Sequence, residues 1–217
     1  MKDCLLPFCL LNWIYLNPGG IPVKEKIKIA DYAQRIAEAL PQGILLNTDG
    51  DKHNAMVIGW GGLGTCWSVP VFTVYVRENR YTKSQLDKTG TFTVSIPLDK
   101  ADPEITKICG WQSGHNIDKV KEAGLTLEAP EANGVSGVKE YPLTLEDPQA
   151  NGVSGVKEYP LTLECRVLYS QCQDPTRLPE SIYKKSYPQD VDSSYPMANR
   201  DPHTAYIGEI VAAYIIH

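Results

Sequence analysis

The apolar residues of the organised part of the chain first recur at helical spacing, at Ile29, Tyr32, Ala33, Ile36, Ala37 and Leu40. This spacing places them on one face of a helix, and Pro41 and Gly43 are typical of its end. A second helix is expected to begin at a capping box formed by Thr82 and Gln85 and to stop at Gly90. A third, short helix is expected in "HNIDKVKEAG".

Strand patterns outnumber these helices. Short apolar or alternating segments occur at "ILLNT", "AMVIGW", "VFTVYVRE" and "TFTVSIPL", and the glycine-rich "GGLGTCWSVP" is expected to be a connection between two of them. Longer strands are expected at Leu161–Cys172, where apolar and polar residues alternate, and at His203–His217. Short helices among many strands favour a mainly β barrel or sandwich rather than an alternating β–α array.

An 18-residue segment occurs twice in tandem, at residues 127–144 and 145–162, and the two copies differ at only two positions. Solenoid proteins need at least three repeats, which cover most of the chain. Two copies surrounded by unrelated strand patterns therefore do not predict a solenoid. We interpret them as a tandem duplication within one ordinary domain.

Only the second copy continues into the long strand that ends at Cys172. We therefore expect Asp147–Glu164 to follow the native path and residues from about Ala129 to Glu146 to form a surplus loop outside the barrel. Loop entropy permits this, because each doubling of loop length costs only about 0.6 kcal/mol. In the alternative, either copy docks and the other loops out.

The first 22 residues differ in character from the rest. The apolar run "CLLPFCLLNWIYL" is shorter than a membrane span and is followed by the linker-like "NPGGIP". We interpret residues 1–22 as a leader and linker, with a cleaved signal as the alternative, and residues 23–217 as one domain. No membrane association is expected.

The charge and cysteine patterns exclude several classes of function. A net charge of −5 gives no basic excess for binding nucleic acid. The cysteines show neither a CxxC motif nor a metal-binding spacing with histidine, so no metal site is expected. Cys165 and Cys172 lie too far apart in one strand to form a disulfide. Free thiols are typical of the cytoplasm, which is the expected location.

The strongest chemical signal is "VRENRYTK", which places Arg77, Arg80 and Lys83 beside Thr82 at an expected helix start. Guanidinium groups, a hydroxyl and free backbone N–H groups together favour a phosphate site. The alternative is a solvated charged surface. His203 stands alone before the last strand, and no hydrolase or P-loop motif accompanies these residues.

Several segments together carry a resemblance to a known family: "NAMVIGWGGLG", "VFTVYVRENRYTKSQLDKTGTFTVSIPL", "ICGWQSGHNIDKVKEAGLTLE", "YPLTLECRVLYSQCQDP", "YPQDVDSS" and "HTAYIGEIVAAYI". They resemble, in consistent order from about Val23 to His217, the flavin reductase-like family on its flavoredoxin-like branch. The resemblance implies an antiparallel, Greek-key split β-barrel with short peripheral helices. It further implies a homodimer that binds FMN near the dimer interface.

The same resemblance implies the cofactor-binding residues, and His203 is implied near the flavin ring or a nicotinamide as a possible catalytic residue. In this sequence the implied cofactor-binding positions are Asn54, Ala55, Met56, Val57, Arg77, Arg80, Tyr81, Thr82, Ser95, Ser113, Gly114 and Lys119. The sequence departs from the family pattern at Ser95, where an asparagine is frequent, and at His115, where an arginine is frequent.

Three functions remain open from the sequence. The first is a reductase that passes electrons from NAD(P)H through FMN to free flavin, ferric iron or a partner protein. The second is an FMN-binding electron carrier that is reduced by a partner protein rather than by NAD(P)H. The third is a barrel that has lost its flavin and acts as a binding module. The flavin would perform the redox chemistry in the first two, so the lack of a catalytic motif is expected.

Overall fold

The computed structural model describes residues 23–131, 152–189, 192 and 200–217. These residues form a sheet in the order β3-β2-β6-β9-β10-β5-β4, with β1 paired to β10 and every pair antiparallel. The strands of this sheet are β1 (Lys24–Lys26), β2 (Ile44–Asp49), β3 (His53–Ile58), β4 (Gly61–Cys66), β5 (Val69–Arg77), β6 (Thr91–Ile96), β9 (Leu161–Cys172) and β10 (His203–Ile216). The expected mainly β, antiparallel architecture is confirmed.

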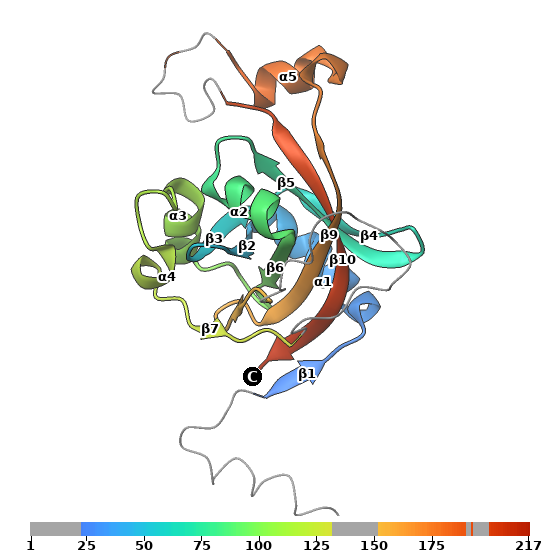
Figure 1. Ribbon diagram of the computed structural model, residues 1–217, viewed down its shortest axis with the longest axis vertical. Coiled ribbons are helices and arrows are strands. Elements are labelled where there is room, and N and C mark those ends of the chain that lie inside the picture. Colours follow the sequence, from blue (N-terminus) through green and yellow to red (C-terminus); the bar gives the residue numbers. More distant parts are fainter. Residues whose placement is uncertain (1–22, 132–151, 190–191, 193–199) are drawn as a thin grey trace, which may run out of the picture.

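Strands β9 and β10 are the longest and run side by side through the middle of the molecule (Figure 1). Because β5 and β6 are consecutive in the chain but lie on opposite sides of this central pair, the connections cross in the manner of a Greek key. A second, two-stranded ladder joins β7 (Leu127–Glu128) to β8 (Gly155–Val156). Figure 1 shows α3 and α4 on one flank of the sheet and α5 beyond the ends of β9 and β10.

The helices are short, as expected. They are α1 (Ala33–Ala39), α2 (Tyr81–Thr89), α3 (Pro103–Trp111), α4 (Lys119–Glu122) and α5 (Glu180–Ser186), with 3₁₀ turns at Ile29–Tyr32, Leu40–Gln42 and Pro175–Arg177. The first, second and fourth helices match the sequence predictions, and Gly90 ends α2 in the left-handed conformation, with φ of 63°. The sequence reasoning did not predict α3 or α5.

Two local predictions were wrong. Thr82 does not form a capping box, because Arg80 is the N-cap residue of α2 and the Thr82 hydroxyl contacts other side chains. The glycine-rich segment after Trp60 is not only a connection, because it forms strand β4 and pairs with β5. Its hairpin turn places Trp67 and Ser68 at positive φ, as the two central residues of a tight hairpin turn require.

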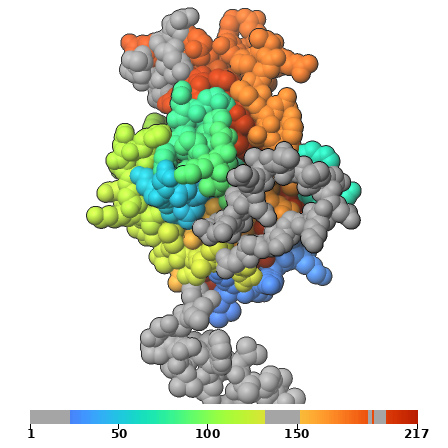
Figure 2. Space-filling model, in the orientation of Figure 1, coloured from blue at the N-terminus to red at the C-terminus, as the bar shows by residue number. Residues whose placement is uncertain are grey.

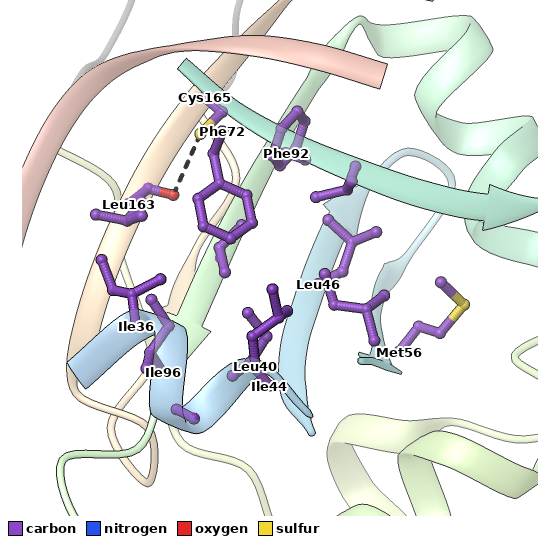
Figure 3. Close-up of a cluster of buried hydrophobic side chains, with 14 of the residues drawn as sticks. Ile36, Leu40, Ile44, Leu46, Met56, Phe72, Phe92, Ile96, Leu163 and Cys165 are labelled. Atoms are coloured by element: carbon purple, nitrogen blue, oxygen red, sulfur yellow. Dashed lines mark hydrogen bonds between the residues drawn. The ribbon is translucent and has the colours of Figure 1, made fainter. Parts of the chain in front are cut away.

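The hydrophobic core has two parts. The larger one fills the space enclosed by the sheet and α1, where Phe72 and Phe92 pack among aliphatic side chains (Figure 3). The smaller one lies between the other face of the sheet and the segment that carries α3 and α4, and it contains Leu45, Ala55, Ile105, Cys109, Leu125, Val156 and Tyr159. Strands β2 and β3 therefore have buried side chains on both faces, since neighbouring residues point to opposite sides.

The described part of the duplication draws on both copies. From the second copy, Val153, Val156, Tyr159 and Leu161 are buried in the body of the domain. From the first copy, β7 pairs with β8, and the backbone N–H of Glu131 donates to Glu164 at 2.7 Å. The rest of the predicted surplus loop lies outside the described residues. Its apolar residues repeat those of the second copy and are Val135, Val138, Tyr141, Leu143 and Leu145.

Candidate functional site

The N-terminus of α2 brings two arginines of the predicted site together. Arg77 is the last residue of β5, and Arg80 is the N-cap residue of α2. No side chain among the described residues caps the first turn, so its partial positive charge adds to that of the two guanidinium groups. Lys83, in contrast, forms ion pairs with Asp87 at 2.7 Å and Glu78 at 3.6 Å, so its charge is neutralised.

The side chain of Thr82 connects α2 to strand β3. Asn54 donates from Nδ2 to the Thr82 hydroxyl oxygen at 2.9 Å, and the Thr82 hydroxyl lies 3.6 Å from the sulfur of Met56. Asn54 is buried, and its Oδ1 has no hydrogen-bond partner among the described residues. A buried carbonyl oxygen without a donor is costly, so this atom is a candidate acceptor for a ligand N–H or O–H group.

The loop before α4, which contains Gly114, packs against Asn54 and Tyr81. A Cβ atom on Gly114 would lie 2.2 Å from Asn54 Oδ1 and 2.8 Å from a ring carbon of Tyr81, so only glycine fits there. Ser113 stabilises the loop by accepting the backbone N–H of His115 at 3.2 Å, and the His115 ring packs 4.7 Å from the Tyr81 ring. Figure 2 shows α2, in green, beside the yellow-green segment of α3 and α4.

Lys119 is a third cation beside the same helix start, and it is buried, whereas Arg77 and Arg80 are half-buried. Its side chain donates to the backbone oxygen of Cys109 at 2.8 Å, while Arg80 donates to the oxygen of Gly110 at 3.4 Å. Both acceptors belong to the last turn of α3, where cations are favourable. Burial is the main reason that the pKa of Lys119 falls to about 8, and the positive charge of Arg80 lowers it further.

We call Arg77, Arg80 and Lys119 the cation cluster. Within the described residues, no carboxylate forms an ion pair with any of the three. The carboxylate of the nearby Asp201 accepts the backbone N–H of Asn79 at 2.7 Å, and the Asp201 backbone oxygen accepts from Arg77 at 2.9 Å. The charge of Asp201 therefore acts on the two arginines without forming an ion pair with them. Burial, followed by repulsion from Arg200, lowers the pKa of Arg80. The cluster therefore has an excess of positive charge, as a site for an anion requires.

His203 lies beside the cation cluster rather than apart from it. It is opposite Arg77 in the pairing of β10 with β5, and its ring packs 4.7 Å from that of Trp60. Its Nδ1 is 2.7 Å from the hydroxyl of Tyr187, and the Arg77 guanidinium lies 5.4 Å from the Tyr187 ring. Burial, and then the charge of Arg77, lower the pKa of His203 to about 4.

Other predicted site residues do not join this group. The side chains of Ala55 and Val57 pack in the smaller core against α3 and α4, and Met56 points into the larger core. Ser95 is fully buried in β6, where its hydroxyl accepts from Asn47 at 2.9 Å and from the backbone of Val156 at 3.4 Å. These four side chains are used in the packing of the domain. Ala55, Met56 and Val57 would therefore contact a ligand only through their backbone atoms.

Sequence reasoning missed Trp60, Gln173 and Tyr187. Trp60 is partly exposed beside His203, and Tyr187 is buried between His203 and Arg77. Trp60 follows the β3 pattern directly, and a polar or aromatic residue at a strand end is a usable signal. No local pattern distinguishes Tyr187 from Tyr183. Tyr187 is buried and Tyr183 is only half-buried, and this difference arises from the path of the chain around α5.

Solved structures with this fold include several flavin proteins. Flavoredoxin of Desulfovibrio vulgaris (Miyazaki F) is 24% identical, with a TM-score of 0.51 over 80% of this chain and 68% of that chain. Nitrilotriacetate monooxygenase component B from Bacillus cereus is 15% identical, with a TM-score of 0.54 over 99% of this chain and 83% of that chain. The NADH:FAD oxidoreductase of Streptomyces globisporus C-1027 is 12% identical, with a TM-score of 0.52 over 80% of this chain and 74% of that chain. At these identities the likeness concerns the fold, and it agrees with the expected split β-barrel.

The sequence comparisons are more specific about family. A search of curated proteins finds no match to this chain. Over the described residues, no helix is both long and apolar enough to cross a membrane. Residues 37–217 match the family described as "Flavin reductase like domain". Since this match covers most of the chain, the protein belongs to the flavin reductase-like family.

Proposed function

We propose that this protein is an FMN-dependent oxidoreductase that passes electrons from NAD(P)H through the flavin to an acceptor, which is free flavin, ferric iron or a partner protein. The observation that carries the proposal is the cation cluster: three buried or half-buried cations without a carboxylate partner among the described residues, at an uncapped helix start. Membership of the flavin reductase-like family supports the same conclusion.

The residues at the site fit a phosphate ester. Arg77 and Arg80 would face the phosphate with their guanidinium groups, and the first backbone N–H groups of α2 would donate to it. The Arg80 guanidinium makes one hydrogen bond among the described residues, of 3.4 Å, so most of its five donors are available. Lys119 would add a third positive charge from the side of α3. We assign the phosphate of FMN to this cluster.

Strand β3 would bind the flavin ring system with its backbone. It is the terminal strand of the sheet, so within the described residues one of its edges has no strand partner. Asn54 Oδ1 would accept from a ring N–H or a ribityl hydroxyl, which would remove the cost of leaving it unpaired. Gly114 would leave room for this approach, because any side chain there collides with Asn54.

Bound FMN would supply the redox chemistry, taking electrons from a nicotinamide and passing them on. The chain itself would bind and orient the flavin, exclude water and balance negative charge. No side-chain acid or base is needed for a hydride transfer. The functional residues would therefore be a binding set rather than a catalytic constellation.

The proposal includes the assembly and the location of the protein. We propose a homodimer, because the apolar residues of β10 fall on both faces of a strand that is already paired on both edges. We propose a reducing, cytoplasmic location, because Cys66, Cys109, Cys165 and Cys172 are free thiols.

Two measurements test the proposal. The purified protein, mixed with FMN and passed over a desalting column, should keep the visible absorbance of the flavin. Stopped-flow mixing of this complex with NADH or NADPH should then bleach that absorbance rapidly. Bleaching by dithionite but by neither nicotinamide would favour the electron carrier. A protein that stays colourless and takes up no FMN would be a binding module without flavin, and the proposal would be wrong.

A further inference from the structure

Three side chains beside the cation cluster form a linear chain of hydrogen bonds. The Tyr187 hydroxyl donates to Oε1 of Gln173 at 2.9 Å, and the same hydroxyl oxygen lies 2.7 Å from Nδ1 of His203. The three residues come from the end of β9, the end of α5 and the start of β10. A backbone bond of 2.8 Å from the N–H of Gln173 to the oxygen of His203 fixes the two outer residues relative to each other.

The number of protons in this chain determines its direction. A tyrosine hydroxyl carries one proton, and an amide oxygen can only accept. Because Tyr187 donates its proton to Gln173, the bond between Tyr187 and His203 must take its proton from Nδ1 of the imidazole. A neutral imidazole has a single N–H, so Nε2 of His203 then carries a lone pair.

The surroundings keep this imidazole neutral. Arg77 faces it from β5 and has the largest effect of the neighbouring charges, Asp201 on its own segment acts in the opposite direction, and Arg80 at the start of α2 has a smaller effect of the same sign as Arg77. The Trp60 ring covers one side at 4.7 Å. Burial and the two arginines hold the pKa of His203 near 4, well below neutral pH. His203 therefore accepts hydrogen bonds at Nε2 and does not serve as a proton donor near pH 7.

We propose that Tyr187 is a positioning residue, which together with Gln173 fixes His203 in the Nδ1–H tautomer and so presents Nε2 as an acceptor for an N–H group of the bound ligand. The inference rests on the proposed function and deepens it, because it names the chemistry that this corner recognises. An amide-type N–H occurs both in the flavin ring system and in the carboxamide of a nicotinamide. An anionic or purely accepting group at this position would be rejected.

The tautomer can be measured directly in the ligand-free protein by ¹⁵N NMR of the imidazole nitrogens. The chain has four histidines, and a His203→Asn variant assigns the signal of interest. We expect His203 to be neutral at pH 7 with the proton on Nδ1. An Nε2–H tautomer, or a charged imidazole at pH 7, would overturn the proposal. This measurement does not depend on flavin binding, so it separates the tautomer from the proposed function.

Substitutions of Gln173 test the direction of the proton chain. Gln173→Glu keeps an oxygen acceptor, so the Nδ1–H tautomer should persist. Gln173→Leu removes the acceptor, and the Tyr187 hydroxyl is then free to donate to Nδ1, which moves the imidazole proton to Nε2. The same tautomer in both variants would show that Tyr187 does not set it.

Substitutions of tyrosine test the effect on ligands. Tyr187→Phe keeps the buried ring but removes the hydroxyl. The matched control is Tyr183→Phe, within α5, whose ring centroid lies 6.2 Å from that of Tyr187. If the flavin provides the N–H, Tyr187→Phe should weaken FMN binding by about tenfold. If the carboxamide provides it, FMN binding should stay the same while KM for NADH or NADPH rises by about tenfold and kcat changes less.

The outcomes separate the two levels of the proposal. Unchanged FMN affinity together with unchanged KM in Tyr187→Phe would overturn the role of His203 as a ligand acceptor. An effect of equal size in Tyr183→Phe would mean that α5 acts only structurally, which also overturns it. If the parent protein binds no FMN, the proposed function and the ligand part of this inference both fall, while the NMR result still decides the tautomer.

Discussion

Two groups of charged residues at different places in the barrel differ in how they are paired. At the cation cluster, Arg77, Arg80 and Lys119 have no carboxylate partner among the described residues. Where the duplicated segment joins the barrel, the buried Glu164 instead accepts from the Tyr214 hydroxyl and from the backbone of Glu131, each at 2.7 Å. We call this second group, formed by Glu164, Tyr214 and Glu131, the base cluster.

The difference indicates what each group is for. Around the base cluster the charges neutralise each other locally, since Lys26 pairs with Glu131 at 3.6 Å and Lys157 with Glu128 at 3.0 Å. Burial and the neighbouring Glu164 raise the pKa of Tyr214, so its hydroxyl stays a donor. Removing one partner of a buried, fully bonded charge is costly, so the base cluster is expected to serve the fold, whereas we propose that the cation cluster, which has no carboxylate partner among the described residues, serves a ligand. Substitutions in the base cluster should therefore change stability, and those in the cation cluster should change ligand binding.

The largest effect is expected from Glu164→Ala. This substitution removes two hydrogen bonds to a charged acceptor and leaves the Tyr214 hydroxyl and the Glu131 N–H without a partner. The free energy of unfolding should fall by about 3 kcal/mol, with no change in FMN affinity of the folded protein. Urea denaturation and FMN titration measure the two quantities. Tyr214→Phe, which removes one of the bonds, should cost about half as much, and a loss of FMN affinity in either variant would contradict the comparison.

The second effect concerns ligand affinity. Arg80→Ala should weaken FMN binding by about tenfold to a hundredfold, because a charge-assisted bond to phosphate contributes about 1.5–3 kcal/mol. Stability without ligand should be nearly unchanged, since Arg80 is repelled by its cationic neighbours. Lys83→Ala is the matched control three residues away, because the charge of Lys83 is already paired. Equal FMN affinity of Arg80→Ala and the parent in a fluorescence titration would rule out the assignment of the phosphate.

A smaller effect is expected from pH. The pKa of Lys119 is lowered to about 8, so in the ligand-free protein the ammonium loses its proton as pH rises through 8, and the phosphate loses one cation. FMN affinity should therefore decrease severalfold between about pH 7 and pH 9. The dependence should vanish in Lys119→Met but persist in Lys88→Met, whose lysine is exposed and paired with Asp51. A parent protein with flat affinity over this range would place Lys119 outside the site.

Lys119 also makes stability depend on pH, and its contribution to stability should change with rising pH in the opposite direction from its contribution to FMN affinity. A folded pKa below the unfolded value means that the unfolded chain binds more protons, so the cost of burying Lys119 is present at neutral pH and is relieved as pH rises from about 8 towards the unfolded value. Above pH 8 the parent should therefore lose less stability with pH than Lys119→Met. Thermal melts of the two ligand-free proteins over this range measure the difference.

The smallest effect is expected from removing one repeat. Deletion of Leu127–Thr144 and deletion of Ala132–Gln149 each leave one complete unit, and only the second keeps Glu131 opposite Lys26. The core has places for one set of apolar side chains, which Val153, Val156 and Tyr159 already fill. Both deletions should therefore keep or raise the melting temperature and keep FMN affinity.

The two deletion variants should differ from each other by less than about 1 kcal/mol, because the ion pair of Lys26 is exposed. A large loss of stability in both would show that the surplus residues are structural. A large loss in the first alone would show that Glu131 holds the junction through more than this ion pair.

The element pattern was largely readable from the sequence. Strand β9 has the bounds that alternation predicted, Leu161–Cys172, and β10 begins at the predicted His203. Helix α2 ends at the predicted glycine. These elements are long or carry strong local signals, such as a left-handed glycine at a helix end. Strand β4 was missed because glycine disfavours strands, and only its pairing with β5 makes it one.

The candidate site was readable only in part. Arg77, Arg80 and Thr82 are close in the chain, so their proximity follows from a strand that leads into a helix. Ser95 shows the limit of the same reasoning, because its polar side chain is used inside the fold by Asn47 and Val156. The burial of β9 was not readable from the alternation of its residues either. Leu161–Cys165 is buried on both faces, whereas the residues after it are progressively exposed.

The sequence by itself determined the mainly β class, the positions of most elements and the family, and it predicted an anion-binding site at the start of α2. It could do so because hydrophobic periodicity and the cluster of basic residues act over a few neighbouring positions. Only the tertiary structure decided that Lys119 joins the arginines, that Lys83 does not, and that the Tyr187 hydroxyl lies between Gln173 and His203. Those contacts join residues from different strands and helices, and the free energy of a buried charge or proton depends on which groups the fold brings within a few ångströms of it.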